Sequence, residues 1–306
     1  MRILACGNQK GGVGKTTCSL NICYSLANTY NQKVLLIDMD SQASSSLNLG
    51  LDVADEGIHT VDELLDPLIR NRKVSWDMIQ ECIYTPTYTD RQRDPDNGMK
   101  WVTIERPFGF DIIPSELYLS VIEMLMGIAG GATRTGINMH YLEMITDRIE
   151  EQGVYDWIII DTPPSLGPLS ICSVAAARDG IIIVSNLDVM STRGITSFIE
   201  SANTVKSYND NHRGILGILL SLYSDRRTID RSIDKWVQEF LPIPTFDTRI
   251  PDTADVKKAN SSALLVSQIN KKARAAFDNL CAEIMYAVEH PEDQIGSARK
   301  AAMGEL

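Results

Sequence analysis

KGGVGKTT, residues 10–17, lies between a short apolar run at residues 3–6 and a segment of helical periodicity at residues 15–30. Backbone N–H groups at the start of a helix have no intrahelical partner and therefore bind anions well. Glycines let the backbone close around a phosphate, and the stretch has three of them: Gly11, Gly12 and Gly14. The pattern predicts a phosphate-binding loop in which the Lys15 ammonium meets the β- and γ-phosphates of a nucleotide and the Thr16 hydroxyl binds Mg²⁺.

The rest of the chain alternates apolar runs with helix-period segments, which is typical of β-α-β units. The runs expected to form buried strands are residues 3–6, 34–37, 110–113, 157–160, 181–184 and 215–220. The segments expected to form helices are residues 15–30, 115–126, 139–151, 169–178, 192–208, 229–240 and 271–288. We predict an α/β fold with a doubly wound, mainly parallel sheet flanked by helices, in a single domain over residues 1–290 with a flexible tail at 291–306.

Residues 84–107 break this alternation. The segment is polar, carries DRQRDPDNG at residues 90–98, and contains a turn signal in Asp-Asn-Gly. We predict a surface insertion with a short hairpin ending at residues 101–104. It is either a tolerated loop or a surface for a partner.

Composition limits the class of protein. The 306 residues are 44% hydrophobic and 23% charged, as in soluble globular proteins. Apolar runs stay well short of the roughly 20 residues that span a bilayer, and the N-terminus turns polar too early for a secretory signal, so we expect a cytoplasmic protein without a membrane anchor. Six cysteines without a CxxC pair indicate buried thiols rather than a zinc site. The net charge of −11 by itself disfavours nucleic acid.

Carboxylates follow two of the predicted strands. Asp38 and Asp40 come directly after residues 34–37, and Asp161 follows residues 157–160. Ligands of open α/β sheets bind outside the carboxyl ends of the strands. These carboxylates are therefore expected to face the ligand crevice, and Asp38 and Asp40, two apart on an extended chain, are expected to face the same side.

The loop departs from the common GxxxxGK[ST] pattern, because Gln9 replaces the first glycine and Lys10 is an additional lysine. In this it resembles the deviant Walker A ATPases, which include the ParA/Soj partition proteins and MinD. DMDSQ at residues 38–42 is similar to their switch I, and DTPPSLGPLS at residues 161–170 is similar to switch II. The resemblance runs to about residue 290.

The resemblance implies ATP and Mg²⁺ as cofactors and a homodimer bridged by ATP, in which Lys10 reaches the phosphates of the partner subunit. It implies that Asp40 orients the attacking water and that Pro251 lies beside adenine. The implied catalytic residues are Lys10, Lys15 and Asp40. The implied nucleotide contacts are Lys10, Gly11, Gly12, Val13, Gly14, Lys15, Thr16, Thr17 and Pro251, and the implied Mg²⁺ residues are Thr16, Asp38 and Asp161. No arginine stands in an obvious finger motif, so we expect slow hydrolysis that a partner accelerates.

ParA proteins bind DNA without sequence specificity, and residues 225–274 could supply the charge, with ten Lys/Arg and seven Asp/Glu. Arg227 falls at a position that contacts DNA in the family. The candidate DNA-binding residues are Arg226, Arg227, Lys257, Lys258, Lys271 and Lys272. Alternatively, these are solvated helix faces paired with Asp230, Asp234 and Asp255.

The leading hypothesis is a ParA-like ATPase that dimerises on ATP, associates with the nucleoid and moves DNA or protein cargo with a ParB-like adaptor. A second is an ATP-gated scaffold that binds only proteins. A third is a MinD-like membrane ATPase, which the tail disfavours because it offers only Arg299 and Lys300. Pro163 and Pro164 disfavour the iron–sulfur branch of the family.

Overall fold

The computed structural model describes residues 1–53, 57–94, 100–132, 137–186, 189–209, 212–240 and 243–291. The tail predicted at residues 291–306 therefore lies, after its first residue, outside the described part of the chain. So does the Asp-Asn-Gly turn predicted within residues 84–107.

A seven-stranded sheet forms the centre of the molecule, in the order β5-β2-β6-β1-β7-β8-β9. Every neighbouring pair is parallel. The strands are β1 (Arg2–Gly7), β2 (Val34–Asp38), β5 (Asp111–Ile113), β6 (Trp157–Asp161), β7 (Gly180–Asn186), β8 (Ile215–Tyr223) and β9 (Thr245–Pro251). The inner strands are continuous apolar runs because both of their faces are covered by helices. The predicted doubly wound α/β fold is confirmed.

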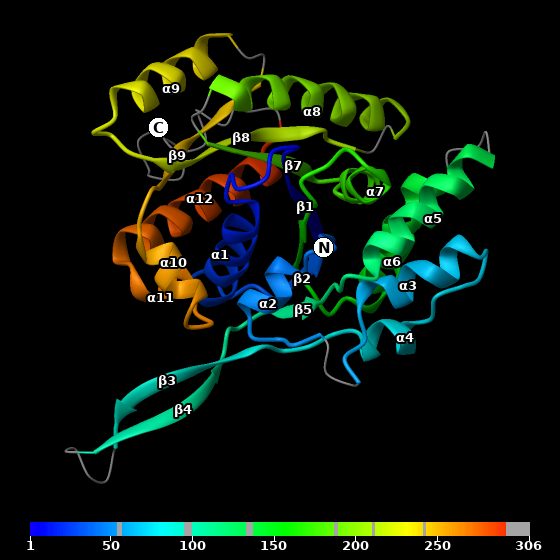
Figure 1. Cartoon of the computed structure of the whole chain (residues 1–306), viewed down its shortest axis with the longest axis horizontal. Helices are drawn as coiled ribbons and strands as arrows, with labels where there is room; N and C mark the ends of the chain where they lie inside the picture. The colour runs from blue at the N-terminus through cyan, green and yellow to red at the C-terminus, as the bar shows by residue number, and fades with distance from the viewer. Residues whose placement is uncertain are drawn as a thin grey trace.

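Helices cover both faces of the sheet (Figure 1). On one face Leu4 of β1 packs in a core with α1 and α12, whereas on the other Ile3 packs in a core with α6, α7 and α8. The helices are α1 (Lys15–Asn28), α2 (Ser44–Asn48), α3 (Val61–Ile69), α4 (Trp76–Glu81), α5 (Leu119–Ala132), α6 (Tyr141–Gln152), α7 (Pro168–Ala176), α8 (Val189–Ser207), α9 (Thr228–Phe240), α10 (Asp255–Asn260), α11 (Val266–Ile269) and α12 (Lys271–Glu289), with a 3₁₀ turn η1 (Ile137–His140).

A two-stranded antiparallel hairpin, β3 (Thr87–Arg93) and β4 (Trp101–Pro107), projects away from this body (Figure 1). It is longer than the hairpin predicted from the sequence. At its base the ring of Tyr88 lies 5.0 Å from the ring of Phe108, which is fully buried. The residues of β3 and β4 are exposed or only half-buried.

Two further expectations need correction. The helix predicted from residue 115 begins at Leu119, because the Ser115 hydroxyl is engaged by the backbone carbonyl of Asp40 at 2.6 Å. The sequence also gave no sign of β9, an edge strand in which buried and accessible residues alternate.

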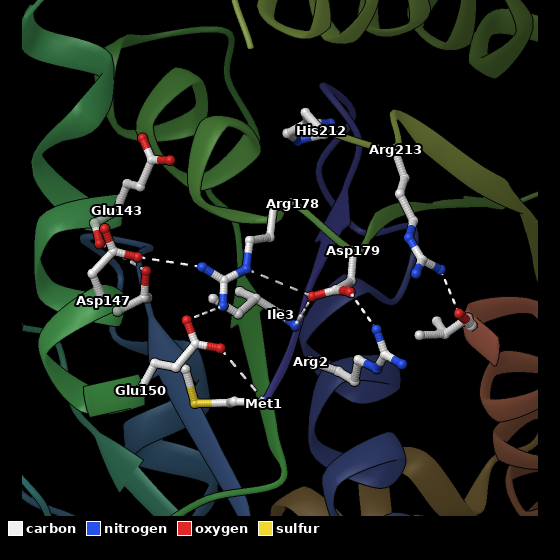
Figure 2. A network of polar contacts seen from close by, with 12 residues as sticks. Met1, Arg2, Ile3, Glu143, Asp147, Glu150, Arg178, Asp179, His212 and Arg213 are labelled. Carbon is white, nitrogen blue, oxygen red and sulfur yellow. Dashed lines mark hydrogen bonds and ion pairs between the residues drawn. The ribbon is translucent and has the colours of Figure 1, made fainter. Parts of the chain in front are cut away.

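An ion-pair network fixes the start of β1, at the opposite end of the sheet from the loop of residues 10–17 (Figure 2). The buried Asp179 carboxylate accepts a hydrogen bond from Ile3 N at 2.9 Å and one from Arg2 Nη1 at 3.2 Å. Arg178 beside it pairs with Glu150 and Asp147 of α6. The network holds β1 in register between β6 and β7.

Candidate functional site

The loop between β1 and α1 has a backbone that requires glycine at two positions. Gly12 has φ 74° and Gly14, the N-cap of α1, has φ 89°. Both angles are left-handed and strained for residues with a Cβ. The loop therefore leads directly into the start of α1, where free N–H groups favour an anion.

Neutral side chains hold this loop in place. The buried Asn8 amide donates to Val184 O at 2.7 Å, while its oxygen accepts from Lys10 N at 3.0 Å. The Ser221 hydroxyl at the end of β8 donates to Val13 O at 2.5 Å. Sequence reasoning missed Asn8 and Ser221, although an Asn directly after the first strand was a usable signal. The loop is thus preorganised by β7 and β8.

Lys15 has a buried side chain within this loop, 7% exposed, whose ammonium donates to Lys10 O at 3.3 Å. Burial lowers the pKa of Lys15, and the carboxylates of Asp161 and Asp40 oppose that effect. Lys10 precedes the glycines with a half-buried side chain. A buried ammonium beside free helix N–H groups is suited to a phosphate.

Asp161, at the end of β6, is fully buried and held by hydroxyls from two elements. Ser19 Oγ of α1 donates to Asp161 Oδ1 at 3.0 Å, and Ser45 Oγ of α2 donates to Asp161 Oδ2 at 2.8 Å. The Thr16 hydroxyl also hydrogen-bonds this carboxylate. The structure thus brings Thr16 and Asp161 together, as the sequence predicted.

Asp38 is the register partner of Asp161 on the neighbouring strand β2 and is also fully buried. Ser46 donates to Asp38 Oδ2 through its N–H at 3.1 Å and its hydroxyl at 2.8 Å. Burial raises the pKa of Asp38 to about 7, and the neighbouring Asp161 adds to the effect. Burial likewise raises the pKa of Asp161.

This pair of carboxylates and the Thr16 hydroxyl fit a hard divalent cation. Mg²⁺ prefers oxygen ligands, keeps several waters and usually takes only one or two carboxylates together with substrate phosphates. Within the described ranges no cluster of three or more His, Cys, Asp or Glu residues could enclose a metal. A cation completed by waters and phosphate oxygens therefore suits these residues better than a cage made by protein alone.

The extended chain expected between Asp38 and Asp40 is not observed. Strand β2 ends at Asp38, and the backbone turns so that Asp40 N donates to Asp38 Oδ1 at 3.1 Å. The Asp40 carboxylate accepts from Gln42 N at 3.0 Å and is 9% exposed. Asp40 nevertheless belongs to the site, because its charge acts on the pKa of Lys15.

The segment after Asp161 lies against the loop. Thr162 donates to Cys6 O at 2.9 Å, and a Cβ on Gly11 would meet Pro164 at 3.9 Å. Further along, a Cβ on Gly167 would lie 1.9 Å from Glu123 Oε1, so the α5 carboxylate occupies the space over the start of α7. Sequence reasoning did not identify Glu123.

A mainly apolar pocket adjoins the loop. It brings Gly14, Thr17 and Cys18 of α1 together with Ser221 and Leu222 of β8, Ile250 and Pro251 of β9, and Thr253, Val256, Val266 and Ala273. Pro251 thus lies next to the phosphate loop, and its contact with adenine stays a prediction. The apolar lining of the pocket suits a flat aromatic base, and the cavity, of about 30 Å³ in this structure, must widen to admit one.

The predicted DNA-binding residues divide into two groups. Arg226 and Lys272 line one shallow pocket, and the others that remain exposed are Lys257, Lys258 and Lys271. Considering only the described part of the chain, none of these five residues forms an ion pair. Arg227 instead pairs with Asp230 and Asp252. The alternative of paired charges therefore holds for Arg227. Asp234, which that alternative also named, pairs instead with Arg249, which is not one of the candidate DNA-binding residues.

A search of the described helices found none with the length and apolar character needed to cross a membrane.

Comparisons with known proteins place this geometry in a family. Residues 1–214 match a family model described as an AAA domain. The chain is 26% identical over 287 residues to the chromosome partitioning protein ParA of Caulobacter vibrioides, covering 93% of this chain and 94% of that protein. It is 26% identical over 276 residues to the sporulation initiation inhibitor protein Soj of Bacillus subtilis, covering 90% and 94%.

A solved structure shares the fold. The crystal structure of cobyrinic acid a,c-diamide synthase from Mycobacterium smegmatis with bound ADP and magnesium matches with a TM-score of 0.73 and 23% identity, covering 96% of this chain and 97% of that one. Since the family match includes both the loop and the carboxylate pair, this chain belongs to the AAA domain family and to the ParA/MinD superfamily of partition ATPases.

Proposed function

We propose that this protein is a partition or positioning ATPase that binds Mg·ATP at residues 10–17. One observation carries the proposal: the fold collects the Lys15 ammonium and the Asp38 and Asp161 carboxylates, all buried, around the start of α1. These three groups are costly to ionise where they are buried, and burial shifts the pKa of each toward its neutral form unless a ligand compensates the charge. The ADP and magnesium bound to the M. smegmatis protein of similar fold support ATP and Mg²⁺ as the ligands.

In this proposal each residue of the site either positions a ligand or neutralises its charge. Lys15 and the loop N–H groups hold the phosphates, and Thr16, Asp38 and Asp161 hold Mg²⁺ and its waters. Asp40, with its backbone fixed by Ser115, orients the attacking water. Bound Mg²⁺ would neutralise phosphate charge. Because these residues include no strong general base, we expect slow hydrolysis that a partner protein stimulates.

We further propose that ATP joins two copies, with Lys10 of each copy reaching the nucleotide of the other. The exposed basic residues Arg226, Lys257 and Lys272 would then be doubled on one dimer, and duplex DNA would be bound through its phosphates. A ParB-like adaptor would stimulate hydrolysis and release the dimer from the nucleoid in the cytoplasm. The name of the C. vibrioides relative supports this assignment.

The test is binding of an arbitrary 30-base-pair duplex with ATP, with ADP and without nucleotide. We expect ATP-dependent binding that Arg226→Glu and Lys272→Glu weaken at least about tenfold, since each replaces an attraction to phosphate by a repulsion. Lys33→Glu, at the opposite end of the sheet before β2, is the matched control. Binding that ignores nucleotide, or no binding with ATP, would contradict DNA-based partition.

A scaffold that binds only proteins is the second candidate, and the β3–β4 hairpin favours it. An isolated two-stranded hairpin is marginally stable in water, so a projecting one is suited to pairing with a partner. Arg93 lies over the ring of Trp101 at 4.9 Å, and Trp101 is 56% exposed. If the charge reversals at Arg226 and Lys272 leave cellular localisation unchanged while Trp101→Ser abolishes it, the scaffold is the correct function.

A further inference from the structure

Arg227 differs from the other basic residues proposed to bind DNA because its charge is already neutralised within the chain. Its Nε lies 3.3 Å from Asp230 Oδ2, and its Nη2 pairs with Asp252 Oδ2. The same Nη2 donates to Leu222 O at 3.2 Å. A guanidinium held by two carboxylates and a carbonyl contributes little to phosphate binding.

Of the groups that hold Arg227, one belongs to the wall of the apolar pocket beside the loop and another lies next to that wall in the chain. Leu222 lines that pocket, and Asp252 directly follows Pro251, which lines it as well. Asp252 N donates to Tyr223 O at 2.9 Å, so the ends of β8 and β9 are joined by a backbone hydrogen bond. Any ligand that pushes on this wall therefore acts on the carbonyl and the carboxylate that hold Arg227.

The backbone at Leu222 is poised for such a change. Its φ of 53° is in the left-handed region, which is strained for a leucine. The preceding residue, Ser221, bonds Val13 O of the phosphate loop at 2.5 Å. A continuous path thus runs from the loop through Ser221 and Leu222 to Arg227.

We propose that Arg227, Asp230, Asp252 and the Leu222 carbonyl form a clasp that withholds Arg227 from DNA, and that a purine nucleotide in the apolar pocket opens it. Filling the pocket displaces the strained Leu222 backbone and the end of β9, and Arg227 is freed toward the exposed Arg226 and Lys272. The clasp rests on the proposed function, and it adds a link through named residues between nucleotide binding and DNA binding.

Asp252→Asn tests the clasp, because it removes the exposed carboxylate and leaves the buried Asp230 in place. Asp225→Asn is the matched control: like Asp252, Asp225 lines the pocket that holds Arg226 and Lys272, and its carboxylate is not one of the groups that hold Arg227. In duplex binding without nucleotide we expect Asp252→Asn to gain about threefold over Asp225→Asn, the size of a half-exposed ion pair. The dependence of log K on log salt should steepen by about 0.9, as for one more phosphate contact.

Linkage adds a second requirement. If ATP opens the clasp, ATP should raise the DNA affinity of Asp252→Asn about threefold less than that of the wild type, because part of the effect is already present. Adding Arg227→Ala to Asp252→Asn should cancel the gain. Equal affinities of Asp252→Asn and Asp225→Asn, or the same gain in the double variant, would overturn the clasp.

The clasp and the proposed function can fail separately. Solvent exchange of the Arg227 Nε–H, followed by NMR with and without a non-hydrolysable ATP analogue, reports the clasp without DNA. Faster exchange with the analogue supports the clasp even if the duplex does not bind, in which case DNA partition alone fails. Unchanged exchange in a protein that binds DNA with ATP overturns the clasp alone.

Discussion

Ser45 Oγ lies 2.8 Å from Asp161 Oδ2 and joins α2 to the end of β6. With Ser19 on the other carboxylate oxygen at 3.0 Å, Asp161 is fixed from both sides by buried hydroxyls. The direction of its oxygens is thus set before any ligand binds. Preorganisation of this kind separates a ligand site from an accidental pair of buried acids.

Ser45→Ala should therefore reduce both stability and Mg·ATP affinity. We expect a loss of about 1–2 kcal/mol in the free energy of unfolding, since a buried carboxylate oxygen is left without its donor. Urea denaturation measures the first effect and calorimetric titration with Mg·ATP the second. Ser44→Ala, at a half-buried neighbour, is the control and should change neither. An unaffected Ser45→Ala protein would show that Asp161 does not need this bond.

Gly167→Ala should disturb the start of α7. Its Cβ would lie 1.9 Å from Glu123 Oε1, so the end of this flexible side chain must turn away, at a cost of about 0.5–1.5 kcal/mol for a less favourable rotamer. Adding Glu123→Ala should recover most of that loss, because the two changes share one contact. Gly127→Ala in the same helix α5 meets open space and should instead stabilise by about 0.5–1 kcal/mol. Thermal denaturation of the wild type, Gly167→Ala, Glu123→Ala and the double variant decides, and additive losses would rule out the contact.

His212 should make the fold less stable in mild acid. Its Nε2 lies 2.7 Å from Val174 O and its Nδ1 accepts from Gly214 N at 2.8 Å, an arrangement that requires the neutral ring. Burial lowers the pKa of His212. Below about pH 6.5 the unfolded chain binds a proton that the folded chain refuses, so stability falls as pH falls.

Unfolding in urea between pH 7.5 and pH 5.5 measures this effect. His212→Gln should flatten the pH dependence, whatever its absolute stability. His59→Gln should change the pH dependence in the opposite direction and make the loss of stability in acid steeper. Glu63 raises the pKa of His59, so protonation of His59 favours the folded state. A pH profile of His212→Gln identical to that of the wild type would contradict the assignment of the neutral ring.

Shortening the hairpin should leave nucleotide binding intact. Thr89 and Glu105 are register partners, so joining them through Asn-Gly removes the outer part of β3 and β4 and introduces a two-residue turn. Since the removed residues of β3 and β4 are exposed or half-buried, we expect stability to change by less than about 0.5 kcal/mol and Mg·ATP affinity by less than about twofold. A severe loss of Mg·ATP affinity would place the hairpin in the nucleotide site.

The central strands could be predicted because each contains a run of aliphatic residues buried on both faces, such as residues 158–160 of β6. The edge strand Thr245–Pro251 was not predicted, because it is not a continuous apolar run: its accessible positions carry polar residues such as Asp247 and Arg249. Helix α2 was not predicted for a different reason. Its sequence SSSLN has no apolar periodicity, and side-chain hydrogen bonds to Asp38 and Asp161 stabilise it.

The residues of the site likewise divide into those that the sequence predicts and those that it does not. Glycines, lysines and strand-end carboxylates are recognisable in sequence because the chemistry of phosphate and Mg²⁺ restricts the residue types. Their neutral partners are not: Ser19 meets Asp161 across 142 positions of sequence, and Ser221 meets Val13 across 208. The pairing of Arg227 with Asp252 depends equally on how β8 and β9 end.

Calorimetric titration of Mg·ATP into Lys15→Ala, with sedimentation of the same samples, tests the nucleotide site most directly. The wild type should bind Mg·ATP and sediment as a dimer, and Lys15→Ala should lose at least about tenfold in affinity and remain monomeric, because one charge-assisted contact to phosphate is gone. Lys33→Ala, before β2 at the far end of the sheet, should behave as the wild type. Unchanged affinity and self-association in Lys15→Ala would contradict the account.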